Sequence, residues 1–427
     1  MRNQGQLDCD LREADVGGYD MRLAERFSKL GTETAFTVAA EARRFAQQGA
    51  RVFPFHLGDM DLKTPENIIE ATNRAMKEGK TGYCSNYGIT ELRDALAEQI
   101  NRSHRTSYSG ANVAIQPGGK PVIQKFFLSL MNPEDEVLIP APGYPIYESI
   151  VAFHGGKPVL YPYREGFGGF NLDLDDLEKR ITPATRFLVF NNLQNPTGAE
   201  EDERGLAALS EVVLRHNLLV LCDEAYFDIR YAGQSHSLVS LPGMEERCLI
   251  LYTFSKKYAM TGWRLGAAVG PQDLVDGIAK LNVNDESCSN HFVQYGGLEA
   301  LTGPQDGARA IIRTLQQRRD RCHELLTAIP DIRCHRPNAT FYLFPNVTTV
   351  MKRMGFDHYE AFRKAALETT GVSFCTRLHF GSPIPEERER YIRLSYSGIG
   401  LEGIEEGMER LRAFVAGESP QRKASSA

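Results

Sequence analysis

The sequence lacks the features that would assign it to a membrane, nucleic-acid-binding or secreted class of protein. The 427-residue chain has no apolar run near the roughly 20 residues that a membrane helix needs. Its formal net charge is −6, so it has no basic surplus with which to bind nucleic acid. Its polar N-terminus has no hydrophobic segment of a signal peptide. We therefore expect a cytoplasmic protein without a membrane or nucleic-acid partner.

The sequence also lacks closely spaced cysteine pairs. Zinc sites usually draw their ligands from such pairs, so we expect no metal site. In a large cytosolic chain the thiols are expected to be reduced. The eight cysteines lie singly along the chain, as Cys9, Cys84, Cys222, Cys248, Cys288, Cys322, Cys334 and Cys375.

What the chain does have is an alternation of strand-like and helical segments between about residues 55 and 310. Hydrophobic residues make up 42% of the chain and charged residues 24%, as in an ordinary globular protein. The alternation predicts an α/β fold, in which helices cover both faces of a mostly parallel, seven-stranded sheet. The seven strand-like runs are Val113–Pro117, Glu136–Ala141, Lys157–Tyr163, Arg186–Asn192, Leu218–Asp223, Cys248–Thr253 and Leu265–Gly270.

The pattern changes after residue 310 and predicts a smaller α+β domain. Helix-like stretches near 307–329, 357–370 and 401–416 are mixed with strand-like runs at 339–345 and 391–396. An amphipathic stretch near 34–48 is expected to join this domain. The predicted organisation is an N-terminal arm with part of the small domain (1–54), a large domain (55–310), the small domain (311–416) and a disordered tail (417–427).

Lys256 is the most informative residue, because it lies just after a buried-type strand between groups that could hold a phosphate. Thr253 and Ser255 precede it, and Arg264 follows eight residues later. A lysine amine can form a Schiff base with an aldehyde, and hydroxyls and an arginine can bind a phosphate. One molecule with both groups is pyridoxal 5′-phosphate. Taken alone, such a lysine is more often a solvated surface charge.

Two other strand ends carry polar groups that could contact a pyridoxal ring. Asp223 ends the run 218–223, where a carboxylate can pair with a protonated ring nitrogen, and Tyr226 follows three residues later. Asn195 lies in the turn Asn-Pro-Thr-Gly after the run 186–192. The alternative interpretations are a helix-capping aspartate and an ordinary Asn-Pro turn.

The segment Pro117-Gly118-Gly119-Lys120-Pro121 joins a strand-like run to a helical one. Glycines let backbone N–H groups approach an anion at a helix N-terminus, and a proline suits the first helical turn. A Gly-Gly pair by itself is weak support for a phosphate site, but its position between strand and helix strengthens the interpretation.

Taken in order, these segments resemble the fold-type-I pyridoxal-phosphate enzymes of the class I/II aminotransferase family, which includes aspartate aminotransferase-like proteins. The resemblance extends over about residues 30 to 412. It is carried by Gly-Gly-Lys, Pro-Gly-Tyr-Pro, Asn-Pro-Thr-Gly, Asp-x-Ala-Tyr, a Ser-Lys pair separated from an arginine by seven residues, and a late Arg-Leu-Ser-Tyr-Ser. It implies an enzyme that moves an amino group between an α-amino acid and a 2-oxo acid, and it implies a homodimer.

The resemblance also implies a role for each matching residue. Lys256, rather than Lys257, would form the Schiff base and carry the proton, because only Lys256 has the family's spacing to Arg264. Asp223 would pair with the ring nitrogen, while Asn195 and Tyr226 would bind the ring hydroxyl. The remaining cofactor contacts would be the phosphate ligands Gly118, Gly119, Lys120, Thr253, Ser255 and Arg264, the stacking Tyr144, and Tyr83 from the neighbouring subunit.

Substrate recognition is implied in the same way at two positions. Arg393 would bind the α-carboxylate with its two-pronged guanidinium, and Gly58 would lie beside it. In family members that favour dicarboxylates, the partner subunit supplies an arginine from the loop that here contains Asp285 and Glu286. Two carboxylates there favour a substrate with a cationic distal group. The alternative is that both acids face solvent.

Two alternatives to transamination remain at this point. The related aminocyclopropane-carboxylate synthases share most of these motifs, and they eliminate or replace a γ-substituent of a substrate such as S-adenosylmethionine. Some transcription regulators carry an aminotransferase-like domain behind a winged helix. Here only about 30 to 50 residues precede the enzyme-like region, which is too short for a DNA-binding domain and a linker.

Overall fold

The large domain is built on one eight-stranded sheet. The computed structural model describes residues 21–31 and 34–418 of the chain. All seven predicted runs form strands of this sheet, but the predicted number of strands was one too low, because the short strand Gly169–Leu172 was missed. In spatial order the strands are β2 (Val113–Gln116), β9 (Gly266–Val269), β8 (Cys248–Thr253), β7 (Leu219–Asp223), β6 (Thr185–Phe190), β3 (Glu136–Ala141), β4 (Lys157–Gly166) and β5 (Gly169–Leu172).

The central strands run parallel, as expected of a sheet with helices on both faces. The pairs β4–β3, β3–β6, β6–β7 and β7–β8 are parallel. The antiparallel pairs are β2–β9, β9–β8 and β4–β5. The missed strand β5 is short and follows a turn with positive φ at Gly168, so its sequence gives little strand signal.

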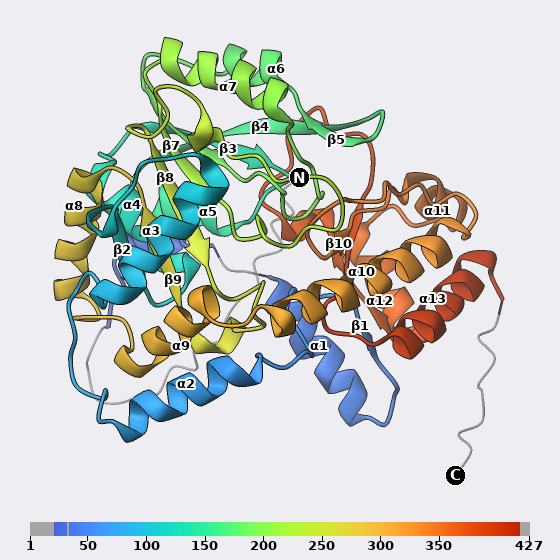
Figure 1. Ribbon diagram of the computed structural model, residues 1–427. Coiled ribbons are helices and arrows are strands. Elements are labelled where there is room, and N and C mark those ends of the chain that lie inside the picture. The colour runs from blue at the N-terminus through green and yellow to red at the C-terminus, as the bar shows by residue number, and fades with distance from the viewer. Residues whose placement is uncertain (1–20, 32–33, 419–427) are drawn as a thin grey trace.

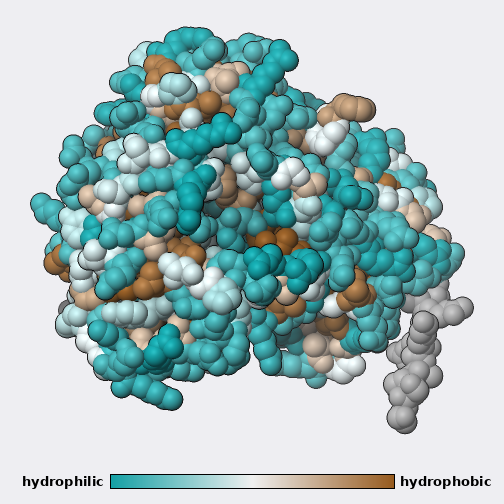
Figure 2. Space-filling view, viewed as in Figure 1, coloured by the Kyte–Doolittle hydropathy of each residue, from teal (hydrophilic) through white to brown (hydrophobic). Residues whose placement is uncertain are grey.

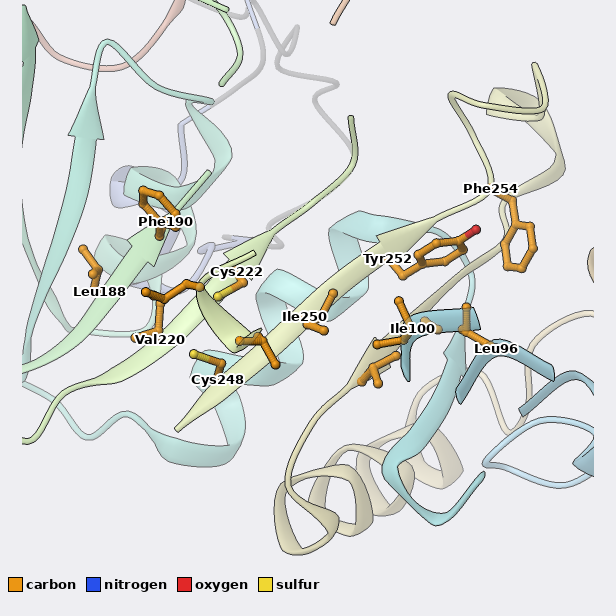
Figure 3. Packing of buried hydrophobic residues seen from close by; sticks show 14 of the residues in the cluster. Leu96, Ile100, Leu188, Phe190, Val220, Cys222, Cys248, Ile250, Tyr252 and Phe254 are labelled. Carbon is orange, nitrogen blue, oxygen red and sulfur yellow. The ribbon is translucent and has the colours of Figure 1, made fainter. Parts of the chain in front are cut away.

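Alternate residues of the central strands point to opposite faces of the sheet, and both faces are buried. Phe187 of β6 and Leu249 of β8 belong to the apolar cluster on one face. Leu188 and Ile250 belong to the cluster on the other face, which also contains Leu96 of α3 (Thr90–His104) (Figure 3). This two-sided burial explains the nearly continuous apolar runs in the sequence.

Helices from the connections between strands complete the two outer layers. The first cluster takes residues from α4 (Gly119–Leu130), α5 (Ile146–Phe153) and α8 (Gln272–Asn284). The second takes residues from α2 (Glu66–Lys77), α3 (Thr90–His104), α6 (Leu174–Lys179), α7 (Glu203–Arg215) and α9 (His291–Thr302). The result is the expected three-layer αβα arrangement. Short 3-10 helices lie at Glu25–Lys29, Gly110–Asn112, Leu238–Ser240, Thr261–Trp263 and Arg377–His379.

The smaller α+β part combines the C-terminal segment with residues from near the N-terminus. β1 (Phe53–Pro54) pairs in parallel with β11 (Val372–Ser373). A second sheet has the order β10 (Tyr342–Leu343), β13 (Ile392–Ser395) and β12 (Cys375–Thr376). Figure 1 shows the C-terminal helices, in orange and red, on the opposite side of the molecule from α8. The helices of this part are α1 (Ala35–Gln47), α10 (Asp306–Thr327), α11 (Thr348–Arg353), α12 (Tyr359–Thr370) and α13 (Leu401–Ala416).

The outer surface is mostly polar. On the face seen in Figure 2, hydrophobic residues form scattered patches among hydrophilic ones. No helix in residues 21–31 and 34–418 is long and apolar enough to cross a membrane. The domain boundary expected at 310/311 falls within α10, so the boundaries stay a prediction. Most of the predicted disordered tail, residues 419–427, lies outside the described residues.

Candidate active site

A cavity of about 590 Å³ lies at the C-terminal ends of the central parallel strands, where open α/β sheets bind their ligands. The small domain closes its other side through Tyr342 and Arg393. The structure therefore brings together most of the residues singled out from the sequence. Those that line the cavity are Gly58, Gly119, Lys120, Tyr144, Asn195, Asp223, Tyr226, Thr253, Ser255, Lys256, Arg264 and Arg393.

The Lys256 side chain extends across the cavity toward Gly58, in the segment that follows β1. Its Nζ donates a hydrogen bond to the Gly58 carbonyl at 3.0 Å and lies 5.5 Å from the centre of the Phe341 ring. The neighbouring Lys257 does not line the cavity, and its Nζ lies 3.4 Å from an Asp228 carboxylate oxygen. The structure thus favours Lys256 over Lys257 as the reactive amine.

Asp223 is buried at the end of β7. Its Oδ2 accepts a hydrogen bond from the Tyr147 hydroxyl at 2.5 Å, and its Oδ1 accepts one from the Ala225 N–H at 3.1 Å. Burial raises the pKa of Asp223, and burial also raises the pKa of Tyr147 well above its usual value, so the phenol stays a neutral donor. A protonated ring nitrogen would supply the cationic N–H donor that favours an ionised buried carboxylate, so this site fits a pyridine ring.

Asn195 is fixed by neighbours on both sides of the cavity. Its backbone N–H donates to Asn191 Oδ1 at 3.0 Å, and the Asn191 side-chain amide donates to the Asp223 carbonyl at 2.8 Å. Asn195 Oδ1 accepts a hydrogen bond from Arg393 Nη1 at 2.9 Å. Because its oxygen is used in this way, the amide N–H groups of Asn195 are the ones suited to an acceptor on the ring.

The N-terminus of α4 forms a cradle with Arg264. Gly118 precedes the helix with a φ of 99°, and a Cβ at this position would lie 2.3 Å from Arg264 Nη2. Only glycine therefore lets the guanidinium approach the first-turn N–H groups, which have no partner within the helix. Thr253 and Ser255 add hydroxyls 2.8 Å apart. These donors fit a phosphate group.

Arg393 is buried between two aromatic rings. Its guanidinium carbon lies 4.3 Å from the centre of the Tyr342 ring and 4.5 Å from that of Phe380. Nη2 donates to the His56 carbonyl at 2.8 Å. Nε is buried and has no hydrogen-bond partner among the described residues. A buried arginine with an unfilled donor at a cavity wall is suited to bind a carboxylate.

Four of the predicted site residues do not line this cavity, and one of them, Gly118, adjoins it behind Arg264. Tyr83 is 87% exposed. Glu286 instead binds the buried Lys125, with Nζ–Oε2 at 2.5 Å, and the side chain of Asp285 is 69% exposed and lies 3.6 Å from the same Nζ. Neither acid lines the cavity of its own protomer, and Glu286 pairs with an internal lysine, so the role of these two acids toward a substrate stays a prediction.

Several residues at the site were missed by the sequence-based analysis. Tyr147 lies one helical turn after Tyr144, and that spacing could have indicated it. Asn191 lies within the run already predicted to lead into the Asn195 turn. Tyr342 lies 78 positions after Arg264, the nearest predicted cofactor contact in the sequence, and its sequence surroundings show only an apolar strand.

Comparison with known proteins agrees with this geometry. The family model for aminotransferase class I and II matches residues 50–411. The chain belongs to this family. Members of the family use pyridoxal 5′-phosphate, and this chain is a pyridoxal-phosphate-dependent aminotransferase.

Similar proteins share almost the whole chain. The aspartate aminotransferase of Bacillus subtilis is 34% identical over 399 residues, which is 92% of this chain and 99% of that protein. The Thermus thermophilus aspartate aminotransferase solved with maleate has a TM-score of 0.85 and 30% identity, over 92% of this chain and 100% of that one. An alanine aminotransferase from Pyrococcus furiosus has a TM-score of 0.85 and 29% identity, over 93% and 100%.

Proposed function

We propose that this enzyme transfers an amino group between an α-amino acid and a 2-oxo acid, with Lys256 as the Schiff-base lysine. The observation that carries the proposal is the unfilled Nε of buried Arg393 on the wall of the cavity that Lys256 enters. Arg393 binds the α-carboxylate, which orients the Cα–H bond toward the Lys256 amine. Bound pyridoxal phosphate supplies an electron-withdrawing ring that stabilises negative charge at Cα.

The other cavity residues have separate tasks in this proposal. Asp223 keeps the ring nitrogen protonated, and Tyr147 holds the carboxylate in place. Asn195 and Tyr226 bind the ring oxygen, and Tyr144 stacks on the ring. The phosphate is bound by the backbone of Gly118, Gly119 and Lys120 and by the side chains of Thr253, Ser255 and Arg264. The Lys256 amine, which donates to the Gly58 carbonyl at 3.0 Å, would accept the proton from Cα and carry it to the ring side of the cavity.

We propose a substrate with an anionic distal group. Four cationic side chains, those of Lys120, Lys256, Arg264 and Arg393, line the cavity against the carboxylates of Asp59 and Asp223. After the α-carboxylate and the phosphate are bound, Lys120 at the exposed rim is suited to attract a further carboxylate. The names of the Bacillus and Thermus relatives, aspartate aminotransferases, support the same class of substrate.

The competing substrate hypothesis is the cationic distal group expected from Asp285 and Glu286. It requires these acids to face the cavity of a second subunit. Under that hypothesis, Asp285→Asn would raise KM for arginine or ornithine selectively. An unchanged ratio of kcat/KM between cationic and neutral substrates would contradict it, and the Lys125–Glu286 pair leads us to expect the unchanged ratio.

The test is the half-reaction of the purified holoenzyme, followed by absorbance without a 2-oxo acid. The panel contains aspartate, alanine, tyrosine, arginine, ornithine and S-adenosylmethionine. We expect conversion of the cofactor to its amino form, fastest with aspartate. Release of a γ-substituent from S-adenosylmethionine without that conversion would instead establish the elimination or replacement alternative.

We also propose a homodimer in a cytoplasmic location. Tyr83 supports the dimer, because a tyrosine that is 87% exposed in one protomer is available to a second subunit. In the proposed dimer it contacts the phosphate bound by its neighbour.

A further inference from the structure

Tyr342 contacts three of the residues to which a role is proposed above, although no sequence motif pointed to it. It lies on β10 of the small domain and is 2% exposed. Its hydroxyl lies 2.6 Å from the Tyr226 hydroxyl, and its ring covers the Arg393 guanidinium. A Cβ at Gly58 would lie 2.2 Å from the Tyr342 hydroxyl oxygen, so only glycine fits beside it.

The direction of the hydrogen bond between the two phenols follows from the role of Tyr226. Burial raises the pKa of Tyr226 well above its usual value, so this phenol keeps its hydrogen. If Tyr226 donates that hydrogen to the ring oxygen of the cofactor, Tyr342 has to be the donor between the two tyrosines. A donor to the Tyr226 oxygen also makes Tyr226 a stronger donor, because hydrogen bonds in a chain polarise one another.

The ring of Tyr342 has a different task from its hydroxyl. Arg393 lies between the rings of Tyr342 and Phe380, with its Nη1 and Nη2 held by Asn195 and His56. The two faces fix the plane of the guanidinium and attract its charge. The direction of the Nε N–H group is therefore fixed before a carboxylate binds.

We infer that Tyr342 is a positioning residue with two separable actions. Its ring orients Arg393 for the α-carboxylate, and its hydroxyl donates to Tyr226 so that Tyr226 donates more strongly to the ring oxygen. The inference rests on the proposed roles of Arg393 and Tyr226. It links the carboxylate site of the small domain to the ring site of the large domain through one side chain.

The test compares Tyr342→Phe, which removes only the hydroxyl, with Tyr342→Leu, which also removes the ring. The first readout is the dissociation constant of the holoenzyme for maleate, an unreactive dicarboxylate. We expect Tyr342→Leu to weaken maleate binding by about three- to thirtyfold, the range for a desolvated cation–π contact. Tyr342→Phe keeps the ring and should stay within about twofold of the wild type.

The second readout is a pH titration of the visible absorbance of the bound cofactor. A weaker donor to the ring oxygen destabilises the deprotonated chromophore, so Tyr342→Phe should raise its apparent pKa by about 0.4 to 1 unit. Tyr396→Phe is the matched control, because it removes a buried hydroxyl bound to the Thr340 carbonyl instead. The control should change neither readout.

Two outcomes would overturn the inference. One is a Tyr342→Phe variant whose titration matches the wild type, and the other is a Tyr342→Leu variant whose maleate affinity is unchanged. If Tyr342→Leu does not fold, Tyr342→Phe still decides the action of the hydroxyl. Failure of the proposed function is distinguishable, because it is measured as absent amino transfer by the wild type, whereas these readouts need no turnover.

Discussion

At the scale of single residues, His56 helps to hold the Arg393 guanidinium that is proposed to bind the α-carboxylate. Its backbone carbonyl accepts from Arg393, while its imidazole is buried and its Nδ1 has no hydrogen-bond partner among the described residues. Burial and then the charge of Arg393 lower the pKa of His56 to about 4. The imidazole is therefore neutral in the folded enzyme at neutral pH, which avoids a second positive charge beside Arg393.

This lowered pKa predicts acid sensitivity. Because the folded enzyme holds His56 neutral down to about pH 4, the unfolded chain binds the proton more readily below its own pKa of 6.5. The contribution of neutral His56 to the free energy of unfolding is therefore fully present above about pH 6.5. It decreases by on the order of 2–3 kcal/mol as the pH falls toward 4. The measurement is the free energy of unfolding in urea at pH 7 and pH 5, for the wild type and His56→Asn.

We expect His56→Asn to lose less stability than the wild type between these two pH values. His358→Asn is the control, because His358 is exposed and its replacement should leave the pH dependence as it is. A wild type and a His56→Asn variant with equal losses would show that other groups cause the acid sensitivity.

At the scale of secondary-structure elements, one buried lysine connects the phosphate side of the site to the end of α8. Lys125 of α4 donates to Asn282 Oδ1 at 2.8 Å and to Glu286 Oε1 at 2.6 Å. The Asn282 amide donates to the Asn86 carbonyl at 2.6 Å. Asn86 belongs to the segment that carries Tyr83, so this network holds that segment against the helix that begins at the phosphate cradle.

The network predicts that Lys125→Met is strongly destabilising. Its side chain is 3% exposed and that of Glu286 is 19% exposed, so the substitution leaves a partly buried carboxylate without its cation. We expect a loss of about 3 kcal/mol in the free energy of unfolding, measured in urea. Lys125→Met combined with Glu286→Leu should recover part of that loss, because no unpaired charge remains.

An exposed ion pair provides the matched comparison for this experiment. Lys157 and Glu134 are 2.6 Å apart, with side chains 57% and 74% exposed, so Lys157→Met should change stability little. If Lys125→Met were equally mild, the Lys125–Glu286 pair would not be a structural contact, and Glu286 would again be a candidate for substrate recognition.

Local sequence patterns predicted some parts of the site, whereas contacts between distant elements could not be predicted. The strand ends that carry Asp223 and Lys256 were predictable, because apolar runs and the polar residues after them are local patterns. The pairing of Lys125 with Glu286 joins residues 161 positions apart, and that of Tyr226 with Tyr342 joins residues 116 apart. No local period marks such contacts, since they depend on how helices and domains pack.

At the scale of the whole molecule, the proposed dimer makes each active site dependent on two chains. Lys256 lies inside the cavity of its own protomer, whereas Tyr83 does not line that cavity. A dimer that contains one Lys256→Ala chain and one Tyr83→Ala chain would therefore have one complete site. That site would combine Lys256 of the second chain with Tyr83 of the first.

This arrangement predicts complementation between two defective variants. Two differently tagged chains, one with Lys256→Ala and one with Tyr83→Ala, are co-expressed and purified over both tags, and amino transfer is measured per dimer. We expect about half of the wild-type activity, because one of the two sites in a symmetric dimer is complete. Doubly tagged dimers with Lys256→Ala in both chains give the background. If Tyr83 acted within its own protomer, both sites of the mixed dimer would be defective, and its activity would stay at or below that of the Tyr83→Ala homodimer.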